Sequence, residues 1–197
     1  MISAYLILAH ANPGQLARLV AALPAHSPVF IHVDKRASDD TFAAMRQALD
    51  SHPNARFVTR HRCYWGGFGI VQGTVALIEE ALASGHAFDY ATLLSGADYP
   101  IKSNEEIARF LAASKGREFI ESFRLDLPNR WSDQGGLFGT PQKLLRFHLH
   151  FRSRTWGTPW IRRLPYGLLP YGGAQWWTLS EAALRFISDY ISARPRA

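Results

Sequence analysis

The sequence has 197 residues, of which 47% are apolar and 19% charged, and this composition excludes a disordered chain and indicates a globular domain. Its single cysteine, Cys63, excludes an intrachain disulfide framework and fits a reducing compartment. The formal net charge is +6. Six basic residues and no acidic residue lie between Gln134 and Ser180: Lys143, Arg146, Arg152, Arg154, Arg162 and Arg163. This basic stretch predicts either a solvated face or an anionic partner, namely a phosphate, a pyrophosphate, a membrane surface or nucleic acid.

The first 115 residues alternate between short apolar runs and capped amphipathic segments. Strands are expected at 5–9, 29–33, 56–59 and 90–94, and each is followed by a helical pattern. Asn12, Ser38 and Ser103 are expected to cap three of these helices, and Ser103 forms an S-x-x-E capping box with Glu106. Strand and helix in strict alternation predict an α/β fold, with a mainly parallel sheet and helices on both faces.

After Gly116 the pattern loosens. Further strands are expected at 118–123, 144–151 and 171–178, and Ser180 is expected to cap a last helix. The sequence contains no repeat and no low-complexity linker, so residues 1–197 are expected to form one domain.

Polar side chains follow several of the expected strands. His10 follows the first strand, Asp34 the second, and Asp98 and Lys102 lie in the turn after the fourth. Open α/β sheets place functional groups at the carboxyl ends of their strands. Such residues therefore indicate a site there, although a solvated turn with a surface charge pair would look the same.

Several common chemistries lack their motifs. The sequence has no phosphate loop of the G-x-x-x-x-G-K-[ST] type, no G-x-G-x-x-G after the first strand and no G-x-S-x-G elbow. The glycines of residues 66–69 form only a weak anion-binding pattern. His148 and His150 have no cysteine or carboxylate at ligand spacing, so no metal site is predicted. Nucleic-acid binding likewise has no motif beyond the basic charge.

Five motifs in order resemble the Branch domain of glycosyltransferase family fourteen. They are A-Y-L-I-L-A-H (4–10), I-H-V-D-K-R (31–36), C-Y-W-G-G (63–67), L-L-S-G-A-D-Y-P-I-K-S-N-E-E-I (93–107) and G-G-A-Q-W-W-T-L-S (172–180). That family contains the core-2 and I-branching β-1,6-N-acetylglucosaminyltransferases and the peptide O-xylosyltransferases. The resemblance implies a GT-A fold, a UDP-sugar donor, a glycan or protein hydroxyl as acceptor, inversion at the anomeric carbon and no metal or other cofactor. The sequence also lacks the Asp-x-Asp pair that binds a metal in many nucleotide-sugar transferases.

The resemblance also implies roles for particular residues. The donor-binding positions are Ala9, His10, Ala11, Asp34, Lys35 and Arg36, with Arg62 near a further nucleotide contact. The acceptor-binding positions are Glu121, Arg130 and Trp131. Trp65, Asp98, Lys102 and Trp176 match family motifs without an assigned role, and the Asp98 turn is expected to be architectural.

One part of the family pattern is missing. The general base of the family is an acidic residue in a P-D-E-like segment beyond the last motif, and the sequence ends at Ala197 without one. The chain is therefore expected to be the donor-binding portion of a longer enzyme, inactive in transfer by itself. A non-catalytic module that binds a nucleotide sugar or a glycan is the alternative. A bacterial enzyme of this kind would be cytoplasmic, and an animal one would lie in the Golgi lumen behind an anchor outside this chain.

Overall fold

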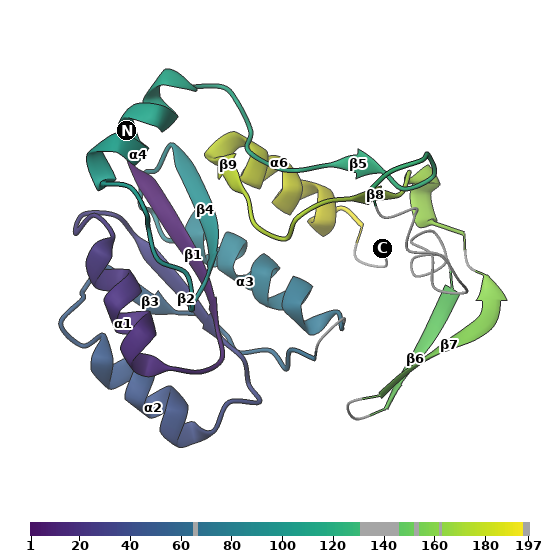
Figure 1. The fold of residues 1–197 in the computed structure, drawn as a ribbon, viewed down its shortest axis with the longest axis horizontal. Coiled ribbons are helices and arrows are strands. Elements are labelled where there is room, and N and C mark those ends of the chain that lie inside the picture. The colour runs from purple at the N-terminus through teal and green to yellow at the C-terminus, as the bar shows by residue number, and fades with distance from the viewer. Residues whose placement is uncertain (65–66, 131–145, 152–153, 162, 195–197) are drawn as a thin grey trace. The chain divides into compact units, whose positions relative to one another are not determined.

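The computed structural model describes residues 1–64, 67–130, 146–151, 154–161 and 163–194 (Figure 1). These residues form two compact units. The first unit consists of Met1–Phe119 and Trp176–Ala193, and the second contains the described part of 120–175 together with Arg194. Each unit is described by itself below. The expectation of one domain over residues 1–197 stays a prediction.

The first unit is built on a five-stranded sheet. Its strands are β1 (Ser3–Ala9), β2 (Val29–Val33), β3 (Ala55–Phe57), β4 (Tyr90–Ser95) and β9 (Thr178–Ser180). The spatial order is β3-β2-β1-β4-β9, in which the first four strands are parallel and β9 pairs antiparallel with β4. The predicted α/β class with a mainly parallel sheet is confirmed.

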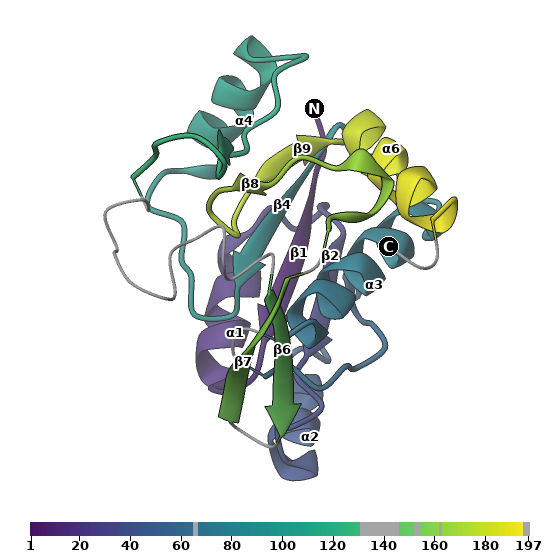
Figure 2. The ribbon, with the colours of Figure 1, turned by 90° about the vertical axis from the view of Figure 1, so that its right-hand side faces the viewer.

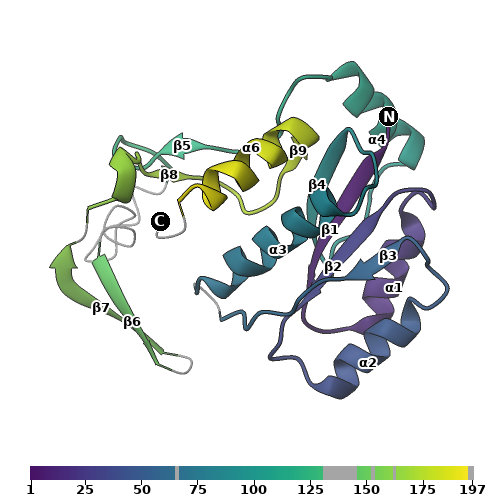
Figure 3. The same cartoon turned by 180° about the vertical axis from the view of Figure 1, so that it is seen from behind.

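Helices cover both faces of this sheet (Figure 1 and Figure 3). Helices α1 (Pro13–Ala22) and α2 (Asp39–Ala48) pack on the face that carries Tyr5, Ile7 and Ile31. Helices α3 (Gly69–Ala83) and α6 (Glu181–Ser192) pack on the face that carries Leu6 and Phe30. Side chains of a strand alternate between the two faces, so β1 contributes to both cores. Among the described residues, every helix is too short or too polar to cross a bilayer.

The predicted helix caps are confirmed. Asn12 Oδ1 accepts the Gln15 N–H at 3.1 Å, and the Ser38 hydroxyl accepts the Thr41 N–H at 3.1 Å. At the start of α4 (Asn104–Ala113), Ser103 and Glu106 form the predicted reciprocal capping box. The Ser180 hydroxyl caps α6 by accepting the Ala183 N–H at 3.2 Å. A cap of this kind satisfies backbone donors that the first helical turn leaves open.

The second unit contains two small antiparallel pairs. Strand β5 (Phe123–Arg124) pairs with β8 (Tyr171–Gly172), and β6 (Arg146–Phe151) pairs with β7 (Arg154–Ile161). A 3-10 turn, η1, spans Pro165–Gly167. Strand β6 confirms the strand predicted at 144–151 over its described part, 146–151, whereas β7 was not predicted.

Two predicted strands are broken in the structure. The expectation of one strand over 171–178 is wrong, because β8 and β9 belong to different sheets. In 118–123, only a bridge from Phe119 to Thr178 and the start of β5 are extended pairings. Gly173 shows why the chain turns after β8: an added Cβ at this residue would lie 1.9 Å from the Glu121 carbonyl oxygen. The backbones there approach too closely for a residue with a side chain.

The strand order creates a switch point beside β1. The chain moves from β1 outward through β2 to β3, and then returns through α3 to place β4 on the other side of β1 (Figure 2). Connections leave β1 and β4 in opposite directions there, and open α/β sheets bind ligands at such a point, outside the carboxyl ends of their strands. This is the edge at which the sequence places its polar residues.

Candidate functional site

The carboxyl ends of β1, β2 and β4 are joined by backbone hydrogen bonds. The Asp34 N–H donates to the Ala9 carbonyl at 2.8 Å, and the Gly96 N–H donates to the Leu8 carbonyl at 2.8 Å. The predicted donor residues Ala9, His10, Ala11, Asp34, Lys35 and Arg36 therefore lie on adjacent strand ends. Ala9 and Asp34 are buried, and the other four are exposed.

Gly96 lets the turn after β4 lie directly against β1. A Cβ added to Gly96 would lie 3.0 Å from the Ala9 Cβ and 3.3 Å from the Ala9 Cα. That contact is tighter than ordinary packing, so a side chain at residue 96 would push the two strand ends apart. The small residues Ala9 and Gly96 together keep this edge of the sheet compact.

Asp34 is the best-defined polar group of the site. Its side chain is held in place because Oδ1 accepts the backbone N–H groups of Arg36 at 2.8 Å and Cys63 at 3.0 Å. The residue is only 9% exposed. Its second oxygen, Oδ2, makes no hydrogen bond with any residue that the structure describes. Asp34 thus presents one fixed carboxylate oxygen that can accept a hydrogen bond from a ligand.

Arg60 holds the segment around Asp34, and sequence reasoning did not identify it. Its guanidinium donates to three backbone carbonyls, those of Val33 at 3.3 Å, Asp34 at 3.0 Å and Ala37 at 2.8 Å. It also lies over the Phe42 ring, 4.4 Å from the centroid. The planar fork of an arginine suits several fixed acceptors at once. No local pattern could have shown this, because the three acceptors lie 23 to 27 positions earlier in the chain.

His32 supports the same segment from inside the protein. It is 1% exposed, and its Nε2 accepts the His61 backbone N–H at 2.9 Å. Burial, reinforced by the charge of His61, lowers the pKa of His32 to about 4. The imidazole is therefore neutral near pH 7 and can act as the acceptor. Next to it, the His61 carbonyl accepts the Lys35 N–H at 2.9 Å.

The cations of the site stand at its exposed rim. Arg36 donates to the Cys63 carbonyl at 3.2 Å and lies 4.5 Å from the centroid of the Tyr64 ring. Lys35 and Arg62 are exposed and form no ion pair with a described acid. Trp65, which follows this segment, lies outside the described residues.

Cys63 is not a reactive group at this site. Burial, with a further contribution from the Asp34 carboxylate, raises the pKa of its thiol to about 11. The thiol therefore stays protonated near neutral pH and is a poor nucleophile. It donates weakly to the His61 carbonyl at 3.5 Å.

The Asp98 turn has an architectural role in this structure. Asp98 Oδ2 accepts the Ser95 N–H at 2.8 Å, which closes the turn after β4. Lys102 pairs with Glu106 at 3.6 Å rather than with Asp98. Trp176 is 42% exposed, next to Trp177, which packs against the core.

The predicted acceptor residues Glu121 and Arg130 come together in the second unit. Arg130 Nη2 lies 2.7 Å from Glu121 Oε2, which also accepts the Ala174 N–H at 3.0 Å. Arg130 further lies 5.2 Å from the centroid of the Phe123 ring. Both charged side chains are more than a third exposed. Trp131 lies outside the described residues.

No group of three or more histidine, cysteine, aspartate or glutamate side chains is placed to hold a metal ion within the part of the chain that the structure describes. The polar chemistry of the strand ends therefore rests on one carboxylate and three exposed cations, Lys35, Arg36 and Arg62.

Known proteins similar to this chain include a family of branching enzymes and several xylosyltransferases. The family model described as Core-2/I-Branching enzyme matches residues 3–190. Xylosyltransferase oxt of Drosophila pseudoobscura pseudoobscura is 28% identical over 176 residues, which cover 88% of this chain and 19% of the relative. Xylosyltransferase 2 of Homo sapiens is 28% identical over 188 residues, which cover 93% of this chain and 21% of the relative. The chain thus spans about a fifth of the length of these curated relatives.

Proposed function

Because the chain belongs to the Core-2/I-Branching enzyme family, we propose that its first unit holds the nucleotide of a UDP-sugar donor. The sugar is then transferred to a hydroxyl group of a glycan or a protein. Relatives named xylosyltransferase favour UDP-xylose as the donor, with UDP-N-acetylglucosamine as the second candidate.

The Asp34 carboxylate is the observation that carries this proposal. Oδ1 is fixed by two backbone N–H groups, and Oδ2 is left for a ligand at the carboxyl end of β2, the strand next to β1. A uracil N–H and a ribose hydroxyl are hydrogen-bond donors, and a carboxylate oxygen is a strong acceptor for either of them. Nucleotides bind at this place in other open α/β sheets.

The diphosphate needs positive charge beside it. Lys35, Arg36 and Arg62 stand at the exposed rim of the same strand ends and supply that charge. Arginine binds phosphate oxygens through two parallel N–H groups, and lysine binds them as a point charge. In this proposal the cations stabilise the leaving diphosphate, and no metal takes part.

The transfer inverts the anomeric carbon. The acceptor oxygen bonds to this carbon as the bond to the diphosphate oxygen breaks, and UDP leaves with the electron pair. A general base takes the acceptor's proton. Asp98 and Glu121 are already engaged, because Asp98 holds the Ser95 N–H and Glu121 pairs with Arg130. Neither is assigned as the base.

The test is a calorimetric titration with UDP and, separately, with uridine. Asp34→Asn is expected to weaken both by about 1–3 kcal/mol, the value of a hydrogen bond to a charged group. Asp40→Asn, an exposed acid in the first turn of α2, is the matched control and should leave both affinities unchanged. Thermal unfolding of each variant shows whether the fold is kept. Equal affinities in wild type and Asp34→Asn would remove Asp34 from the nucleotide site.

A further inference from the structure

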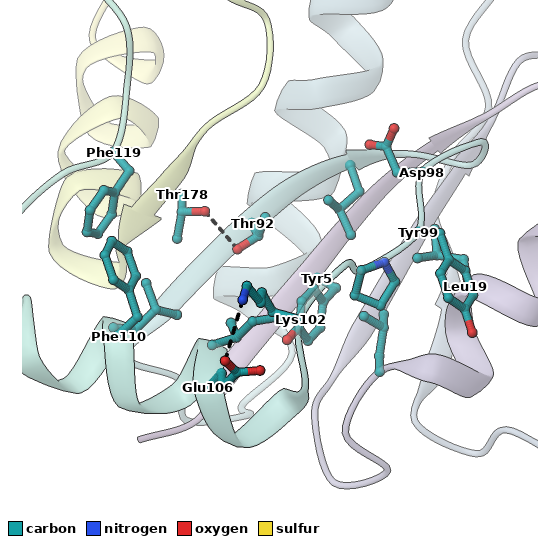
Figure 4. Close-up of a pocket in the computed structure, with 15 residues that line it drawn as sticks. Tyr5, Leu19, Thr92, Asp98, Tyr99, Lys102, Glu106, Phe110, Phe119 and Thr178 are labelled. Atoms are coloured by element: carbon teal, nitrogen blue, oxygen red, sulfur yellow. Dashed lines mark hydrogen bonds and ion pairs between the residues drawn. The ribbon is translucent and has the colours of Figure 1, made fainter.

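A largely apolar pocket lies in the first unit, between helix α4 and the sheet (Figure 4). Its volume is about 770 Å³, within the range of small-molecule sites. The walls come from α1, from strands β1, β4 and β9 and from α4. Most of the lining is apolar, including Leu19, Leu23, Leu94, Ile107, Phe110 and Phe119. None of the donor-end residues Ala9, His10 and Asp34 lines it.

Helix α4 is anchored at both ends, which keeps the pocket between it and the sheet. At its start, the Asn104 side-chain amide donates to the Ala22 carbonyl at the end of α1, at 3.1 Å. At its end, the Tyr90 hydroxyl donates to the Ser114 carbonyl at 3.2 Å. The Phe110 and Phe119 rings also meet, with centroids 5.3 Å apart. These contacts hold α4 in place, so the pocket belongs to the packed structure of the first unit.

Most polar groups in the pocket already have partners. The hydroxyls of Thr92 and Thr178 bond to each other at 2.9 Å. Lys102 and Glu106, both largely exposed, form an ion pair at 3.6 Å. The Asp98 carboxylate holds the Ser95 N–H, as described above.

Two tyrosine hydroxyls of the lining, those of Tyr5 and Tyr99, lack such a partner among the described residues, and Tyr5 is the buried one of the two. The side chain lines the pocket from β1, and the residue is only 6% exposed. Its hydroxyl makes no hydrogen bond with any described residue. Burial raises the pKa of Tyr5, so the phenol stays protonated and is available as a donor. The hydroxyl is not sealed from the pocket, so an oxygen of a ligand there can accept its hydrogen bond.

We propose that this pocket binds a neutral ligand with an apolar alkyl chain and a single oxygen that accepts the Tyr5 hydroxyl. The apolar walls favour the alkyl chain, because they remove its surface from water. Glu106 neutralises Lys102, the cation lining the pocket, so a free carboxylate on the ligand gains no partner. An alcohol, ether or ester oxygen therefore fits better than an anionic headgroup. This site goes beyond the proposed function and does not depend on it.

The experiment measures binding of 1-decanol and of decanoate at pH 7.5 by calorimetry on the full chain. Wild type is expected to bind 1-decanol saturably at one site and more tightly than decanoate. Tyr5→Phe keeps the ring and removes the donor, so 1-decanol binding should weaken about fivefold, the worth of one neutral hydrogen bond. Ile107 is half-buried on α4 and lines the pocket, so Ile107→Trp should fill the pocket and abolish binding.

Phe186→Trp is the matched control, an aromatic exchange on the exposed side of α6, where Phe186 is 69% exposed. It should bind 1-decanol as wild type does, and circular-dichroism melts should show that all variants are folded. The proposal is overturned if wild type shows no saturable binding or if decanoate binds more tightly. It is equally overturned if Tyr5→Phe binds with unchanged affinity, or if Ile107→Trp binds as well as Phe186→Trp.

Discussion

The buried imidazole of His32 is expected to make the stability of the first unit depend on pH. Its Nε2 accepts the His61 N–H, and a proton on that nitrogen would remove the acceptor and place a charge in the core. Burial is the main cause of its lowered pKa, and electrostatic interactions with His61 and Arg60 act in the same direction. The Asp34 carboxylate acts in the opposite direction and raises the pKa of His32, but its effect is smaller than that of His61.

The magnitude follows from the two pKa values of His32. In the unfolded chain the pKa is the ordinary 6.5, and in the folded protein it is about 4. Between these values the unfolded state binds more protons, so the free energy of unfolding falls as pH is lowered. The contribution is fully present above pH 6.5 and is lost as pH falls through 4. About 2.5 pH units at 1.36 kcal/mol each give a loss of about 3 kcal/mol.

The assay compares urea unfolding of wild type and His32→Gln at pH 7 and at pH 4. Glutamine offers an amide oxygen to the His61 N–H and does not titrate, so the variant should lack this loss. The wild type should therefore lose about 3 kcal/mol more than the variant between the two pH values. His26→Gln, an exchange at an exposed histidine, is the control and should follow wild type. The reasoning is refuted if wild type and His32→Gln lose the same stability.

Two further substitutions test how the strand ends are held. Gly96→Ala should destabilise the protein by about 1–3 kcal/mol, because its Cβ would crowd Ala9, whereas Gly14→Ala in α1 meets only Asn12 Oδ1 at 3.9 Å and should not. Thermal melts of the two variants decide this, and a Gly96→Ala melt equal to wild type would contradict it. Arg60→Gln should cost about 1–3 kcal/mol and speed amide exchange of residues 34–37, because it removes donors to three carbonyls. Unchanged exchange there would show that Arg60 does not hold this segment.

The sequence was sufficient for features that depend on local patterns. The helix caps at Asn12, Ser38, Ser103 and Ser180 are set by one side chain and the backbone N–H three residues later. The parallel strands are apolar runs of the expected length. The carboxyl ends of these strands, and the polar residues that follow them, could therefore be identified from the sequence.

Features that depend on distant pairings could not be predicted. The antiparallel strand β9 joins the sheet through residues 86 to 90 positions away from their partners in β4. Arg60 and His32 act through backbone groups of other segments, so their roles could not be predicted from local spacing, although His32 lies in the I-H-V-D-K-R motif. Lys102 pairs with Glu106, four residues later, rather than with Asp98, although Lys102 precedes the N-cap Ser103 and lies outside α4.

The central claim is that a uridine nucleotide binds at the carboxyl ends of β1 and β2. Hydrogen exchange of the whole chain with and without saturating UDP tests it most directly. The account predicts slower exchange in residues 9–12, 34–37 and 60–64, with no change in α4 or α6. Protection confined to other segments, or no protection by UDP at any concentration, would contradict it.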